Sequence, residues 1–196
     1  MPYPGRRRVV EPLAILEYPA PVPSASRVGT RRLRLDPVAA SDEDLLYRFF
    51  QDDHVRRYML DGALVNRVWV AGEIAASARR FADGLLGLFA ARLRATGELV
   101  GVAGFRPDHE PPVMELVYAL LPTCCGRGLA TEMARAMVEL AFHRHGWTLL
   151  RAAVDEPNAA SIRVLERLGF APAGESPGAF GRMLHFTLTA PSERAG

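Results

Sequence analysis

Apolar and polar residues alternate in several short segments of the chain, and in longer segments apolar residues recur every three or four positions. The alternation over residues 31–38 is typical of a half-buried strand. Apolar runs at 86–95 and 98–107 flank the turn dipeptide Thr96-Gly97, so they predict a β-hairpin. Further apolar runs also predict strands, at 113–122, 147–155 and 181–189.

Helical spacing predicts four helices. The first opens at Ser41, an N-cap residue followed by an acidic first turn, and continues through LLYRFFQDD. The second covers residues 68 to about 83. The third follows a glycine-rich segment and ends at Gly146, and the fourth is short and lies between Asn158 and Gly169.

The order of these elements predicts an α/β fold. One strand and two helices come first, followed by a three-strand meander and then by helix, strand, helix and strand. The sheet is therefore expected to be mixed, antiparallel where hairpins join the strands and parallel across the third helix. We expect one domain over 29–190 and a short C-terminal tail over 191–196. The Pro- and Arg-rich N-terminal extension over 1–28 is expected to be either disordered or draped over a neighbour.

The composition is globular, with 49% apolar and 23% charged residues. No run approaches the roughly 20 apolar residues of a membrane-spanning helix, and prolines interrupt the N-terminal apolar stretch, which makes it a poor signal peptide. We therefore expect a cytoplasmic protein that does not bind membranes. All 24 basic residues are arginine, but the net charge of +2 does not favour nucleic-acid binding.

Cys124 and Cys125 are the only cysteines, and they are adjacent. Adjacent cysteines close only a strained disulfide ring, and two thiolates alone make a poor metal site. The sequence therefore predicts neither a disulfide scaffold nor a bound metal. A thiolate nucleophile at the start of the third helix is a minor alternative.

The glycine-rich segment CCGRGLAT (124–131) joins a predicted strand to a predicted helix. A helix N-terminus binds anions through its unpaired N–H groups and its partial positive charge. Gly126 and Gly128 let the backbone approach a phosphate closely, and Arg127 adds a cation. We interpret the segment as a phosphate-binding loop, and an ordinary strand-to-helix turn has about equal weight on spacing alone.

This segment resembles the acetyl-CoA pyrophosphate loop of the GNAT N-acetyltransferases, whose pattern Gln/Arg-x-x-Gly-x-Gly/Ala falls on residues 125–130. Other segments of the chain are similar to the same family in the same order: TRRLRLDPVAASDEDLLYRFFQDDHVRRYM, GELVGVAGFRP with MELVYALLP, and VDEPNAASIRVLERLGFAPAGE. Together they resemble the RimJ/RimL-like branch, which acetylates ribosomal-protein N-termini, over about residues 30–189.

The resemblance implies a GNAT fold whose central sheet splays at the cofactor strand. It also implies that acetyl-CoA is the co-substrate and that backbone amides of the loop hold its pyrophosphate. Asn158 would bind the pantetheine and Ser161 would lie near the sulfur, although a helix N-cap and a solvated hydroxyl are the plainer roles of these two residues. The implied cofactor-binding residues are Val117, Ala119, Leu121, Cys125, Gly126, Arg127, Gly128, Leu129, Ala130, Thr131, Asn158 and Ser161.

Glu115 is the candidate general base, because a carboxylate in an apolar strand is costly unless it is used or paired. Pairing with Arg106 is the equally weighted alternative. The tyrosine that many members of the family use to protonate the thiolate is replaced by Leu165. The acid would then be Ser161, water or Tyr118. A backbone N–H near residues 120–121 is the expected oxyanion donor.

The resemblance therefore implies acetyl transfer to a primary amine by direct attack in a ternary complex. A GNAT-fold sensor or partner module that binds acyl-CoA without turnover is the alternative. The amine, either a protein N-terminus or a small molecule, would be held by residues 44–85 and a loop near 172–182. The sequence leaves open whether the protein forms a homodimer.

Overall fold

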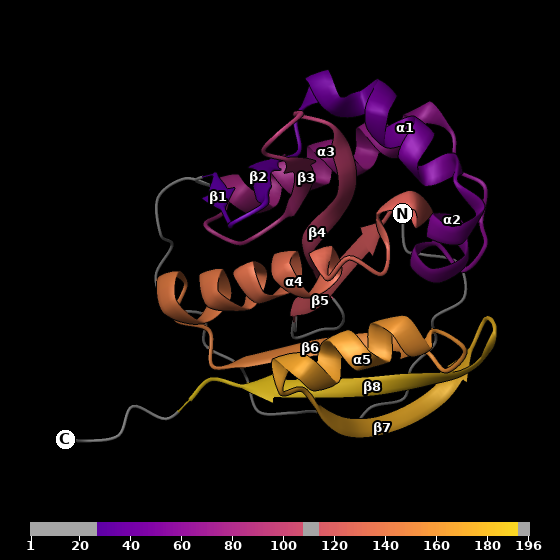
Figure 1. Cartoon of the computed structure of the whole chain (residues 1–196), viewed down its shortest axis with the longest axis vertical. Helices are drawn as coiled ribbons and strands as arrows, with labels where there is room; N and C mark the ends of the chain where they lie inside the picture. The colour runs from indigo at the N-terminus through magenta and orange to yellow at the C-terminus, as the bar shows by residue number, and fades with distance from the viewer. Residues whose placement is uncertain (1–26, 108–113, 192–196) are drawn as a thin grey trace.

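The computed structural model describes residues 27–107 and 114–191, so nearly all of the predicted extension and tail lies outside the described residues. An eight-stranded sheet forms the centre of the molecule (Figure 1). Its spatial order is β1-β2-β3-β4-β5-β6-β8-β7. The strands are β1 (Val28–Gly29), β2 (Leu33–Pro37), β3 (Leu88–Leu93), β4 (Leu99–Pro107), β5 (Met114–Leu120), β6 (Leu149–Asp155), β7 (Ala171–Gly178) and β8 (Gly181–Thr189).

Helices cover both faces of this sheet. They are α1 (Glu43–Gln51), α2 (Asp53–Met59), α3 (Arg67–Ala82), α4 (Leu129–Glu139) and α5 (Ala159–Leu168). Short 3-10 turns precede α1 and α4, at Ala40–Asp42 and Pro122–Cys124, and a π-helical turn, Leu140–Arg144, extends α4. No helix within the described residues is long and apolar enough to cross a membrane.

Two hydrophobic cores lie on opposite faces of the sheet. Residues of α4 and α5 pack on one face, together with the large side chains of Phe89, Phe105 and Trp147. Residues of α1, α2 and α3 pack on the other face, which includes Phe50 and Val102. Neighbouring positions of one strand serve opposite cores because successive side chains of a strand alternate in direction.

Every neighbouring pair of strands is antiparallel except β5 and β6, which are parallel. The parallel contact within the described residues is a single pair, Glu115 with Arg151, whereas β4 and β5 pair at seven successive positions. Beyond Glu115 the two parallel strands separate. The mixed α/β fold and the splayed cofactor strand are therefore both confirmed.

The helix predicted after Ser41 is α1, and a second helix that was not predicted, α2, follows it directly. Asp52 has extended backbone angles (φ −63°, ψ 131°), and its carboxylate accepts hydrogen bonds from the N–H groups of His54 and Val55. An aspartate that caps a new helix in this way ends the preceding one. The predicted helix thus ends close to where α1 ends, and the short α2 was missed.

The segment expected to be a loop near 172–182 contains a strand, β7, which pairs with β8 at the edge of the sheet. Pro172, Gly174 and Pro177 are unfavourable residues for a central strand. An edge strand tolerates them because it pairs on one side only, and the pairing register shifts between Pro172 and Glu175.

Candidate functional site

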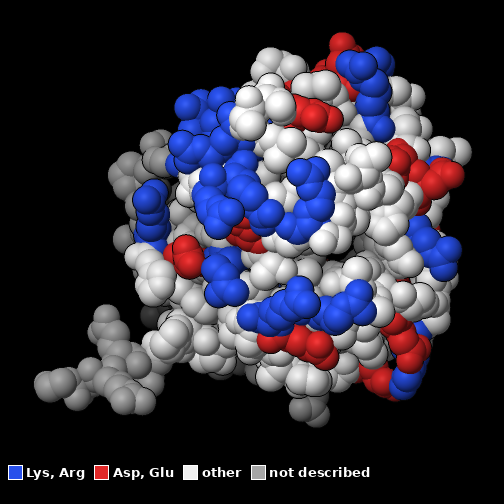
Figure 2. All heavy atoms as spheres, in the orientation of Figure 1, with Lys and Arg blue, Asp and Glu red and all other residues white. Residues whose placement is uncertain are grey.

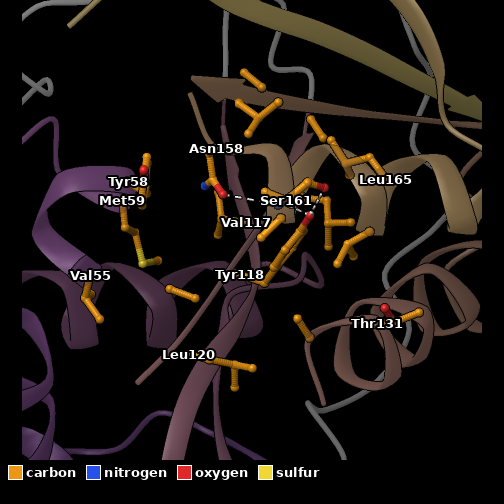
Figure 3. A pocket seen from close by; sticks show the side chains of 18 of the residues that line it. Val55, Tyr58, Met59, Val117, Tyr118, Leu120, Thr131, Asn158, Ser161 and Leu165 are labelled. Carbon is orange, nitrogen blue, oxygen red and sulfur yellow. Dashed lines mark hydrogen bonds between the residues drawn. The ribbon is translucent and has the colours of Figure 1, made fainter. Parts of the chain in front are cut away.

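A cavity of about 530 Å³ lies where β5 and β6 separate. Residues of α4 and α5 line one part of it, and residues of α2 and α3 line the other. Figure 3 shows these two sides: Val55, Tyr58 and Met59 project from α2, and Tyr118 faces α5 across the cavity. Segments far apart in sequence therefore enclose one site.

The predicted phosphate loop lies at the edge of this cavity. Gly126 (φ +72°) and Gly128 (φ +73°) both adopt the left-handed conformation that favours glycine. Gly128 is the N-cap of α4, so the first-turn residues from Leu129 to Thr131, all of which line the cavity, have N–H groups without intrahelical partners. A Cβ atom at Gly126 would meet no atom within 4 Å, so this part of the loop borders open space. The loop can therefore receive an anion such as a pyrophosphate.

An ion pair between Arg32, which directly precedes β2, and Glu132 of α4 supports the loop. The backbone N–H and Nε of Arg32 donate to the carboxylate of Glu132 over 2.7 and 2.6 Å, and Arg32 Nη1 donates to the carbonyl of Arg127 over 2.8 Å. Thr30 Oγ1 also donates to Glu132, over 2.6 Å. Burial raises the pKa of Glu132, but the bonds from Thr30 and Arg32 outweigh it, so the pKa lies below its usual value. The loop is thus anchored before any ligand binds.

Two of the basic side chains that line the cavity come from α5, a predicted helix whose arginines were not selected as site residues. Arg127 is exposed and does not line the cavity, whereas Arg163 and Arg167 of α5 do. These two arginines stand four residues apart, so they lie on one face of the helix. Figure 2 shows basic side chains gathered around the hollow in the middle of this face of the molecule. The spacing of these two arginines within a predicted helix was the signal in the sequence that could have identified them.

Backbone groups of β5 also reach the cavity. The N–H of Leu121 donates to the carbonyl of Val100 over 2.9 Å. This bond shows which residues of β5 direct their backbone groups at β4 and which direct them away from it. Hydrogen-bonded pairs alternate along such a ladder, so Tyr118 and Leu120 direct their backbone groups toward the gap beside β6. The backbone groups of Val117, Ala119 and Leu121 point at β4, while Val117 and Ala119 also line the cavity.

Tyr118 and Ser161 form a hydrogen-bonded pair inside the cavity, with 2.7 Å between their hydroxyl oxygens (Figure 3). Asn158 lies beside them, and its side-chain oxygen accepts the N–H of Ser161 over 3.1 Å, as an N-cap of α5 does. Burial raises the pKa of Tyr118 well above its ordinary value, and the bond with Ser161 opposes this only in part. The structure thus brings together Tyr118, Asn158 and Ser161, which the sequence analysis had selected from two segments far apart in the chain.

Glu115 belongs to the opposite part of the cavity. It is 7% exposed and lies beside Arg106 in the β4–β5 register, so the two side chains share one face of the sheet. Arg106 Nη2 contacts Glu73 of α3 at 3.2 Å, which shows that this face is turned toward α3. The candidate base therefore lies in a charged environment rather than an apolar one.

The two cysteines have different surroundings. Cys124 is buried in the core beneath α4, and Cys125 is exposed, lines the cavity and donates to the carbonyl of Leu121 over 3.6 Å. Burial raises the pKa of Cys125, and Cys124 and Asp52 raise it further. A raised pKa keeps the thiol protonated, so these surroundings do not favour a thiolate nucleophile. Within the described part of the chain, no group of three or more His, Cys, Asp or Glu residues is placed to hold a metal.

Known proteins match most of the chain. Residues 32–171 match the model of the acetyltransferase (GNAT) domain. The uncharacterized protein YkkB of Bacillus subtilis is 31% identical over 74% of this chain and 84% of its own. The uncharacterized N-acetyltransferase p20 of Bacillus licheniformis is 26% identical over 74% of this chain and 82% of its own.

Solved structures share the fold. An acetyltransferase from Agrobacterium tumefaciens superposes with a TM-score of 0.72, at 24% identity over 95% of this chain and all of its own. A ribosomal alpha-N-protein acetyltransferase, RimL, solved in complex with coenzyme A, superposes with a TM-score of 0.71, at 13% identity over 84% of this chain and 98% of its own. With the domain match, the splayed strands and the loop before α4 in agreement, the chain belongs to the GNAT acetyltransferase family.

Proposed function

We propose that the protein is an acetyl-CoA-dependent N-acetyltransferase that transfers the acetyl group directly to a primary amine in the cytoplasm. The observation that carries the proposal is one cavity between β5 and β6 that holds an anion-binding loop at one end and Glu115 at the other. The hydroxyl pair of Tyr118 and Ser161 also lines it. Both reactants can meet in such a cavity.

The residues present fit acetyl-CoA. The left-handed glycines before α4 leave the backbone open to a pyrophosphate, and Arg163 and Arg167 add positive charge beside it. The backbone groups of Tyr118 and Leu120 face the gap beside β6 and would hold the amide-containing pantetheine arm as a neighbouring strand would. When bound, acetyl-CoA supplies an activated acetyl thioester.

Residues of the protein carry out the proton transfers and stabilise the thioester oxygen. Glu115, directly or through water, takes a proton from the ammonium of the acceptor, so that the neutral amine can attack. The N–H of Leu120 is the candidate donor to the thioester oxygen, because the N–H of Leu121 is already bonded to Val100. Tyr118, whose raised pKa keeps its hydroxyl protonated, gives a proton to the departing sulfur. It thereby serves in place of the tyrosine that is Leu165 here, a buried core residue.

A turnover assay on the full chain tests the proposal. Release of free coenzyme A is measured with small amines, amino acids and peptides with free N-termini, and the acetylated product is identified by mass spectrometry. N-acetylated forms of the same compounds serve as matched controls. We expect release that requires a free amine. Tight acetyl-CoA binding without turnover on any amine would contradict the proposal and favour a non-catalytic acyl-CoA sensor.

A further inference from the structure

Four ionisable side chains gather at the α3 side of the cavity: Glu73, Arg80, Arg106 and Glu115. Two are acidic and two are basic, so the cluster is neutral overall. Glu73 and Arg106 form an ion pair at 3.2 Å, and Glu115 lies directly across from Arg106 on the neighbouring strand. These contacts connect Glu73, Arg106 and Glu115, and the charge of Glu73 also acts on Arg80.

Arg80 takes no part in the ion pair between Glu73 and Arg106. Its Nε and Nη2 atoms are buried, and neither has a hydrogen-bond partner among residues 27–107 and 114–191. Burial lowers the pKa of Arg80, and Glu73 opposes that effect while Arg106 and Arg79 add to it. Buried donors without acceptors are costly and therefore rare in folded proteins. Because Arg80 lines the cavity, a ligand within the cavity can supply the missing acceptor.

A carboxylate is the acceptor that suits this position. Guanidinium N–H groups form a planar fork that binds both oxygens of a carboxylate. A cluster of four charged side chains that is neutral overall matches one added negative charge better than the two of a phosphate monoester. Glu115, in the same cluster, attracts the ammonium of the acceptor, and Val55 and Met59 of α2 add apolar surface for a side chain.

Given the proposed acetyltransferase function, we propose that the acceptor is a small amine that also carries a carboxylate, such as an amino acid, and that Arg80 binds this carboxylate. Arg80 is thus a specificity-determining residue on α3. The ammonium lies toward Glu115 and the carboxylate toward α3. No covalent step is added to the reaction, because Arg80 only orients the acceptor.

The test compares matched acceptors on the full chain. Leucine, methionine and phenylalanine are each assayed beside the carboxamide and the decarboxylated amine of the same skeleton, and phosphoethanolamine is included as a phosphate-bearing amine. We expect kcat/KM for the carboxylates to exceed that for their amides by about ten- to a hundredfold, the range of a charge-assisted bidentate bond. Arg80→Met should abolish this preference, mainly by raising the KM of the acid, and Arg80→Lys should restore part of it.

Arg79→Met is the control, because Arg79 precedes Arg80 on the same helix but is exposed and outside the cavity. It should keep the preference, and thermal unfolding should show that all three variants fold. Equal rates with acids and amides, a preference for phosphoethanolamine, or an unchanged preference in Arg80→Met would overturn the inference while the acetyltransferase function stands.

Absence of turnover with every amine would count against the acetyltransferase function instead. In that case, calorimetric titration of the protein saturated with coenzyme A with the same acids and amides tests separately whether Arg80 binds the carboxylate. Acids that bind only to proteins with Arg80 support it, and acids that bind no better than amides refute it.

Discussion

At the scale of single residues, the hydrogen bond between Tyr118 and Ser161 connects two segments that are 43 positions apart in the chain. Each hydroxyl is ordinary in sequence: Tyr118 lies in an apolar strand and Ser161 in the first turn of a helix. Only their distance of 2.7 Å, inside the cavity, makes them a candidate proton donor. Leu165 stands at the position of the tyrosine that many family members use to protonate the thiolate, and its buried side chain has no proton to give. If a side chain protonates the thiolate here, it must be a different residue.

Tyr118→Phe should lower kcat about ten- to a hundredfold, because it removes the proton donor while keeping the ring in place. The KM for acetyl-CoA should change much less. Burial holds the pKa of Tyr118 above its ordinary value of 10.0, so the donor stays protonated through the alkaline assay range. The wild-type rate should therefore not fall between pH 8 and 10 through titration of this group.

Steady-state rates across that pH range check both expectations. Tyr47→Phe is the matched control, since Tyr47 lies on α1 against Arg67 and outside the cavity. A Tyr118→Phe protein with full kcat would exclude the phenol as the acid and leave Ser161 or water.

At the scale of elements, the start of α4 combines a left-handed glycine turn with an anchored loop. Gly128 takes a left-handed conformation as the N-cap, and Arg32 of the segment before β2 holds the carbonyl of Arg127. This arrangement exposes the first N–H groups of α4 to the cavity without a side chain in the way. The anion site therefore depends on backbone geometry more than on the identity of the flanking side chains.

Gly128→Glu should abolish acetyl-CoA binding, because the new carboxylate both occupies the anion site and repels a pyrophosphate. The left-handed backbone should also lower the free energy of unfolding by about 1–2 kcal/mol. Gly97→Glu is a close control: Gly97 has nearly the same φ, +76°, but lies in the β3–β4 turn, with nothing within 4 Å of a Cβ atom. Calorimetric titration with acetyl-CoA should show binding by the Gly97 variant and none by the Gly128 variant. Equal affinity in both would refute the location of the pyrophosphate.

At the scale of the whole molecule, the cavity lies between two parts of the sheet, each with its own helices. β1 to β5 carry α1, α2 and α3 on one face, and α5 lies over β6 on the other part. Basic side chains gather on the face where α4 and α5 lie (Figures 1 and 2), although the net charge of the chain is only +2. The protein therefore offers a local positive field to an anionic ligand on this face.

Replacing Arg163 and Arg167 together by Gln should weaken acetyl-CoA binding about three- to tenfold, since each exposed cation contributes a modest attraction. The loss should be largest at low salt and should shrink as salt is added, because added ions screen exposed charges. Replacing Arg48 and Arg79 by Gln removes the same charge outside the cavity and should leave the affinity unchanged. A loss that does not depend on salt, or an equal loss in both double variants, would contradict a direct electrostatic role.

The order of elements could be predicted from local pattern because periodicity, turn dipeptides and helix caps act over a few residues. The hairpin at Thr96-Gly97, the helix after Gly128 and the stop at Gly169 follow directly from such signals. The short helix α2 and the strand β7 were missed, because a seven-residue helix and a Pro-rich edge strand depend on their neighbours in space.

The sequence by itself determined the mixed α/β class, the glycine loop before α4 and the resemblance to the GNAT family, since these depend on residues close together in the chain. Only the tertiary structure decided which backbone groups of β5 face the gap, that Tyr118 meets Ser161, and that Arg80 joins Arg106 and Glu115 at one end of the cavity. The physical reason is that strand register and helix packing set these distances, and both result from the burial of whole apolar faces.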